Sequence, residues 1–246
     1  MPALRVLWHA LVGLYDEMIT LVLGNLLWVC LNLPVYLLLL AVGVPFLGGG
    51  VPESGPGWLL LLPAWLLILL PTPAGIALGG LASVATGPDA PHARLFWEAL
   101  RTRWRLALGC CGLSLVGTVA LLANLYFYAV LSSGWPRVLT ILWLYAIVLW
   151  AGMHVYLVPL LHHVRRPRLL DLYRRAALIA LGHAGYTLVV VLGILLLGLS
   201  SVLFLPAYLL VGGAYVALAQ AHAFREIRRR HGDLVVAPEP DKGSVF

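Results

Sequence analysis

The sequence predicts an all-α protein that crosses a lipid bilayer several times. Of its 246 residues, 62% are hydrophobic and only 11% are charged, and the charged residues leave long uncharged stretches between them. A soluble domain is about half apolar and about a quarter charged, so this composition excludes both a soluble domain and a disordered chain. The uncharged stretches lack the alternation of barrel strands, and a helix satisfies its own backbone polar groups in lipid.

Five stretches contain no Asp, Glu, Lys or Arg, and a bilayer core of about 30 Å needs roughly 20 apolar residues per helix. The last stretch, 176–224, is too long for one helix, and Ser200, Ser201 and Pro206 divide it. Pro206 then falls in the first turn of the last helix, where its missing N–H does no harm. We expect six transmembrane helices, at about residues 20–45, 58–84, 106–131, 138–161, 177–199 and 203–224.

The basic residues predict the orientation. With six spans, 15 of the 16 Lys and Arg residues fall on one side of the membrane, and Arg137 alone falls on the other. Basic residues concentrate in cytoplasmic loops, so we expect a multi-pass inner-membrane protein with both termini in the cytoplasm. A net charge of +6 is consistent with binding to nucleic acid or to a membrane surface. Because the chain is so apolar, we expect the membrane surface and no nucleic-acid partner.

Residues 1–19 are expected to form a helix that lies in the cytoplasmic interface. Between residues 4 and 18 the large apolar side chains recur at helical spacing within an arc of roughly 120°. We expect no signal-peptide cleavage here, because Asp16 and Glu17 interrupt the segment and the apolar run beyond them is too long. At the other end, the polar segment 226–246 is expected to be a disordered cytoplasmic tail.

Two further amphipathic segments, 94–105 and 168–175, each precede a pair of predicted spans. Residues 5–11 (RVLWHAL) and 94–100 (RLFWEAL) share four of seven identities, whereas the copy that begins at Arg168 keeps only the arginine and the apolar pattern. Two interpretations stay open. The chain contains a three-unit repeat, or interfacial helices simply share this composition.

No catalytic or metal-binding constellation emerges from the sequence. The spans contain no acidic residue, lysine or arginine, which argues against a proton-coupled transporter or an ion pump. The histidines form no H-E-x-x-H motif and the cysteines no Cys-x-x-Cys motif, so neither a metal nor another cofactor is expected. Ser114 lies outside any Gly-x-Ser-x-Gly elbow, and Cys110 and Cys111 have no base nearby in sequence. We therefore expect a protein that is not an enzyme.

Three asparagines lie within predicted spans, and an amide in lipid needs hydrogen-bond partners. Asn25 and Asn32 are two helical turns apart and share one face of the first span, whereas Asn124 lies deep in the third. Each asparagine either bonds to a neighbouring helix or lines a polar path. We favour a packing contact for Asn124 and leave both interpretations open for the other two.

The second span should be kinked or unwound. Pro71 and Pro73 each remove a backbone donor, and Gly75, Gly79 and Ser83 follow at four-residue spacing, which allows a close helix crossing. Broken helices at membrane depth line cavities or serve packing, and both interpretations remain.

Several segments together resemble the YesL-like family of bacterial integral membrane proteins, a domain of unknown function. The resemblance covers about residues 10–225. Its segments are LYDE at 14–17, GNLLW at 24–28, LP at 33–34, PAGIAL at 73–78, FWEAL at 96–100 with Arg105, and NLYFY at 124–128. The chain differs from the family in its Gly/Pro-rich loop at 48–57, its Pro71 and Pro73 pair and its added tail. The resemblance implies a small bacterial inner-membrane protein, and genes of this family often lie beside sugar-uptake ABC transporters.

Two functions are consistent with these features. The first is a non-enzymatic accessory component that binds a partner such as an ABC transporter, with a role in carbohydrate transport or signalling. The second is a small facilitator of an uncharged solute, suggested by the broken second span and the three asparagines.

Overall fold

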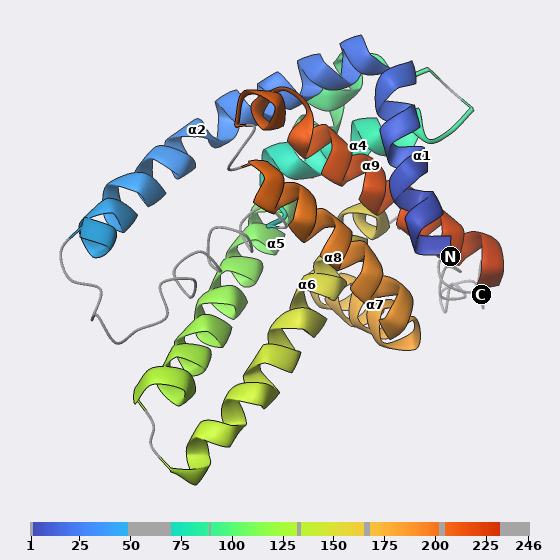
Figure 1. The fold of residues 1–246 in the computed structure, drawn as a ribbon. Helices are drawn as coiled ribbons and strands as arrows, with labels where there is room; N and C mark the ends of the chain where they lie inside the picture. The colour runs from blue at the N-terminus through green and yellow to red at the C-terminus, as the bar shows by residue number, and fades with distance from the viewer. Residues whose placement is uncertain are drawn as a thin grey trace, which may run out of the picture.

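The computed structural model describes residues 2–48, 70–88, 90–131, 134–164, 168–201 and 205–231. This part of the chain is all-α and contains eight α-helices, with a short π-helix and a short 3-10 helix between two of them (Figure 1). The elements are α1 (Pro2–Asp16), α2 (Met18–Gly48), α4 (Pro73–Ala85), α5 (Arg94–Tyr126), η2 (Phe127–Leu131), η3 (Trp135–Val138), α6 (Leu139–His163), α7 (Leu169–Gly182), α8 (Ala184–Ser201) and α9 (Leu205–His231).

Helices α5 and α6 form a long antiparallel hairpin that projects from the other helices (Figure 1). Gly134, at the start of the return turn, has a φ of 71°, a conformation that glycine adopts without strain. Two contacts fix the register of the pair. The Trp150 indole N–H donates to Thr118 over 3.0 Å, and the rings of Tyr128 and Trp143 stack 6.1 Å apart.

In the described part of the chain, two helices are each long and apolar enough to cross a membrane, and both belong to the hairpin: Arg94–Val130 and Trp135–His163. Along α5, exposed Trp104 and Tyr126 are 22 residues apart, or about 33 Å at 1.5 Å per residue. Aromatic side chains gather at the two surfaces of a bilayer whose core is about 30 Å thick. The spacing therefore matches one crossing. The described residues contain up to four crossings if each of two bent helix pairs counts as one, and six are not seen among them.

Helix α1 turns away from α2 by 99°. It packs on α9 and α8, and its residues Ala3, Val6 and Ala10 are buried. Large apolar side chains elsewhere on α1 are exposed, with Trp8 64% and Tyr15 80% accessible, whereas Leu7 and Leu14 are half-buried against the core. Much of the face that the sequence predicts for lipid is thus left uncovered by the described part of the protein.

The segment expected to span at 58–84 differs from the prediction. Residues 58–69 lie outside the described part, residues 70–72 are not helical, and α4 begins only at Pro73. The Thr72 hydroxyl accepts a hydrogen bond from the Gly75 N–H over 3.0 Å, and Pro73 occupies the first helical position. A hydroxyl N-cap followed by proline is a strong helix start, so Thr72 and Pro73 begin a short helix.

Three other boundaries differ from the predicted ones. The span predicted at 177–199 is divided between α7 and α8, which meet at His183 with a bend of 102°. The amphipathic segment 94–105 is not a separate helix, because α5 runs without a break from Arg94. Residues 226–231, expected in the disordered tail, continue α9 as far as His231. Residues 232–246 lie outside the described part.

The bends also bear on the proposed repeat. The first and third units each have an amphipathic helix that turns by about 100° into an apolar one, whereas the second unit is the straight helix α5. The first and third units therefore share an arrangement that the second unit lacks.

Helix α9 lies at the centre of the fold and contacts α1, α2, α4, α6 and α8 (Figure 1). Its buried face consists mainly of small residues, including Ala214, Ala217, Ala219 and Ala223. Small side chains let helix backbones approach closely, and this explains how one helix packs against five others.

Candidate functional site

Asn25 bonds to a neighbouring helix. Its side chain is fully buried between α2 and α9, and its amide oxygen accepts a hydrogen bond from the Ala214 backbone N–H over 2.9 Å. A Cβ atom on Gly213 would lie 2.7 Å from this oxygen. Because Gly213 has no side chain, α2 can approach α9 closely enough for this bond to form.

The other two asparagines bond within their own helices. Asn32 is buried, and its amide donates to the Trp28 carbonyl over 2.8 Å. The Asn124 amide donates to the Ala120 carbonyl over 2.8 Å. Among the described residues, no hydrogen bond joins Asn124 to another helix, so its amide is satisfied without a helix contact.

The small residues of α4 form a close crossing with α6. A Cβ atom on Gly79 would lie 2.2 Å from Cγ1 of Val158, and one on Gly80 would lie 2.8 Å from the His162 ring. The crossing is also bonded, because the His162 Nε2–H donates to the Ile76 carbonyl over 2.8 Å. Gly79 therefore lies against α6, while Gly75 faces Thr72 and Trp28 at the start of α4.

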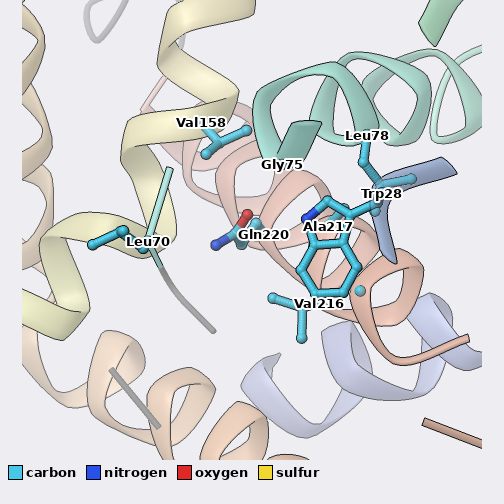
Figure 2. A pocket seen from close by; sticks show the side chains of 9 residues that line it. Trp28, Leu70, Gly75, Leu78, Val158, Val216, Ala217 and Gln220 are labelled. Atoms are coloured by element: carbon cyan, nitrogen blue, oxygen red, sulfur yellow. The ribbon is translucent and has the colours of Figure 1, made fainter. Parts of the chain in front are cut away.

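A cavity of about 30 Å³ lies beside the start of α4, next to Leu70 and Gly75. Figure 2 shows the Gln220 amide between Val158 and the Trp28 indole, with Gly75 and Leu78 of α4 above it. Gln220 is 5% exposed, and its amide has no hydrogen bond to another described residue. A cavity of this size has room for a water molecule and is too small for a sugar.

The largest buried polar cluster joins α5, α6 and α7 through Ser114, His154 and Tyr173, and we call these three residues the polar cluster. His154 Nε2 lies 2.7 Å from the Ser114 hydroxyl, which lies 2.5 Å from the Tyr173 hydroxyl. The ends of this chain are backbone carbonyls. His154 Nδ1 lies 2.7 Å from the Trp150 carbonyl, and the Tyr173 hydroxyl donates to the Cys110 carbonyl over 2.8 Å.

Counting protons shows that the polar cluster is one hydrogen short. A carbonyl only accepts, so both terminal contacts take their hydrogen from the cluster, and the proton of a neutral His154 lies on Nδ1. The four contacts need four hydrogens, whereas a neutral imidazole and two hydroxyls supply three. One contact therefore lacks a hydrogen unless His154 is an imidazolium.

A serine hydroxyl beside a histidine nitrogen is also the start of a nucleophile–base pair. However, Ser114 is fully buried and His154 is 3% exposed, so a substrate has no access to the hydroxyl. The arrangement fits an internal connection between three helices better than a nucleophilic site. Among the residues described, no three His, Cys, Asp or Glu side chains converge on a metal position.

The sequence pattern drew attention to Ser114 only as a possible nucleophile, and the polar cluster was missed. One signal was present, because Ser114 lies eight residues inside the predicted span 106–131 and His154 seven residues before the end of 138–161. In antiparallel neighbours these positions have equal depth. Tyr173 gave no such signal, since it falls in a segment expected at the membrane surface.

Comparisons with family models, with curated proteins and with solved structures find no match for this chain.

Proposed function

We propose that this chain is a non-enzymatic component of a bacterial inner membrane that assists or binds a partner. The observation that carries the proposal is the use of its buried polar side chains. Several of them bond from helix to helix, as Asn25 does to Ala214 and Tyr156 does to Thr187 over 2.8 Å. Such bonds hold a helix assembly in one arrangement and leave few polar groups for a solute.

The partner proposal also draws on the uncovered face of α1. Amphipathic helices with exposed aromatic side chains lie in the membrane interface and anchor a protein to one leaflet. Helix α1, with exposed Trp8 and Tyr15, has this character. The resemblance to the YesL-like family supports an ABC transporter for carbohydrate as the partner, through gene neighbourhood alone. The proposed topology has six spans and both termini in the cytoplasm, and reporter fusions after Phe246 and within residues 48–57 test it.

The second candidate is a facilitator of an uncharged solute, and the cavity at Gln220 favours it. The cavity lies beside the start of α4 and contains an amide without a partner among the described residues. Its volume of about 30 Å³ does not pass a sugar unless the helices move.

One pair of experiments separates the two functions. Purified full-length protein in liposomes should give no flux of uncharged sugars above that of protein-free liposomes. Cross-linking in native membranes should capture a defined membrane protein in constant proportion. Saturable flux by the purified protein would refute the accessory function.

A further inference from the structure

The amide of Gln220 points into the cavity beside the start of α4 and has no hydrogen-bond partner among the described residues. Gln220 lies on α9 and is 5% exposed, and Figure 2 shows its amide between the Val158 side chain and the Trp28 indole. An amide carries two N–H donors and an acceptor oxygen. Because a buried polar group without a partner destabilises the folded state, this amide requires a partner that the described protein does not supply.

The side chains that face the amide cannot act as this partner. The cavity wall next to Gln220 and Trp28 consists of apolar side chains and glycine, including Gly75, Leu78, Val158, Gly213, Val216 and Ala217. None of these side chains has a hydrogen-bonding group. A partner for the amide must therefore occupy the cavity itself and bring its own donor and acceptor.

A second set of polar atoms gathers at Gly75, on the edge of the same cavity. A Cβ atom on Gly75 would lie 3.1 Å from Thr72 Oγ1, 3.5 Å from Trp28 Nε1 and 3.7 Å from the Leu70 carbonyl oxygen. The Leu70 carbonyl accepts a hydrogen bond from the Thr72 N–H over 2.8 Å, and a carbonyl oxygen has a second lone pair. Hydrogen-bonding groups thus adjoin the cavity at the start of α4 as well as on α9.

We propose that the cavity holds ordered water, which bonds to the Gln220 amide and links it to the polar atoms beside Gly75. A water molecule needs roughly 10–15 Å³ of cavity and about two to four polar partners, so the volume of about 30 Å³ suits one or two waters. A bridging water is nearly as favourable in enthalpy as a direct hydrogen bond. The water joins α9 to the start of α4, as the direct bond of Asn25 joins α9 to α2.

X-ray hydroxyl-radical footprinting of the full-length protein in nanodiscs tests for this water. X-rays split a bound water molecule, and the hydroxyl radical oxidises a side chain beside it even where bulk solvent has no access. Leu78 and Leu81 form a matched pair on α4, because they are 1% and 0% exposed and, of the two, Leu78 lines the cavity. Mass spectrometry should show that Leu78 is oxidised several-fold faster than Leu81.

Two variants test whether the water depends on the amide and on the cavity. Gln220→Leu removes the amide and keeps a large side chain, so the oxidation rate of Leu78 should fall to that of Leu81. Ala217→Val keeps the amide and fills part of the cavity from the same helix. It should lower the Leu78 rate in the same way, and it decides alone if Gln220→Leu fails to fold.

Three outcomes would overturn the proposal. Equal oxidation of Leu78 and Leu81 in the unmodified protein would mean that the cavity is dry. An unchanged Leu78 rate in the folded variants would mean that the oxidising water lies elsewhere. Protection of Leu78 alone by millimolar urea would mean that the amide binds a small neutral solute instead of water, which would favour the facilitator function.

Discussion

The amide oxygen of Asn25 accepts a hydrogen bond from the backbone N–H of Ala214, 2.9 Å away on a helix that lies 189 residues later in the sequence. Asn32, two turns along the same helix, bonds instead to the Trp28 carbonyl of its own helix. Two asparagines on one helix face thus have different roles. One holds two helices together, and the other satisfies itself.

Asn25→Ala should destabilise the protein by about 0.6–2 kcal/mol, the measured range for a hydrogen bond between helices in a membrane. Asn124→Ala is the control, because its amide bonds only within α5 among the described contacts, and it should cost less than about 0.5 kcal/mol. Unfolding by denaturant in detergent gives both values. Equal losses would show that the bond from Asn25 to Ala214 adds no specific stability.

Gly79→Ala should destabilise the protein by about 1–3 kcal/mol, because the new methyl group would lie 2.2 Å from Val158 Cγ1 and would force α4 and α6 apart. Gly112→Ala provides the opposite case. A Cβ atom there meets nothing within 4 Å, so the substitution should stabilise α5 by about 0.5–1 kcal/mol. Thermal unfolding of both variants measures the contrast, and a neutral Gly79→Ala would disprove the close crossing.

The proton count predicts the order of two substitutions in the polar cluster. Ser114→Ala leaves the His154 ring nitrogen buried without a partner, which costs about 1–3 kcal/mol. After Tyr173→Phe, two contacts of the polar cluster remain, from His154 to the Trp150 carbonyl and from Ser114 to His154. A neutral imidazole and the serine hydroxyl supply the two hydrogens that these contacts need, so the substitution should cost only about 0.5–1.5 kcal/mol. The free energies of unfolding of the two variants test this order. A greater loss for Tyr173→Phe would mean that His154 is charged and that the full chain of four bonds exists.

Spin labels on α1 should distinguish its two faces. Labels at Leu11 and Tyr15, which are 51% and 80% exposed, should collide with oxygen dissolved in lipid. A label at His9 should collide with a water-soluble reagent, and one at Ala10, which is fully buried, should meet neither. If the water-soluble reagent reached Leu11 as readily as His9, α1 would not lie in the membrane interface.

Much of the helix pattern could be predicted from the sequence, because uncharged apolar stretches reflect the cost of charge in lipid. The predicted span 138–161 corresponds closely to α6, and the prolines Pro71 and Pro73 lie at the start of α4. The bend at His183 was missed, since Gly182 and His183 interrupt neither the hydropathy nor the charge pattern. The continuity of α5 from Arg94 was also missed. Amphipathic spacing predicts a helix but does not reveal whether that helix bends or runs straight on into the apolar segment that follows it.

The polar contacts were less predictable than the helices. The sequence identified Asn25 as a residue that needs a partner, but not that the partner is a backbone N–H beside Gly213. That choice depends on which helices adjoin, and hydropathy carries no information about helix neighbours. The same limit explains Gln220, which the sequence analysis did not single out although it lines the cavity in Figure 2.

Cysteine accessibility tests the central claim most directly, namely that the buried amides of Asn25 and Asn32 are bonded within the protein and do not line a water-filled path. Single cysteines replace Asn25, Asn32 and Gln220 in a variant that lacks Cys30, Cys110 and Cys111, and a water-soluble thiol reagent is applied to membranes from both sides. The account predicts protection at positions 25 and 32, which are buried, with at most slow labelling at 220 beside the cavity. Rapid labelling at 25, 32 and 220 would reveal a continuous aqueous path and contradict the account.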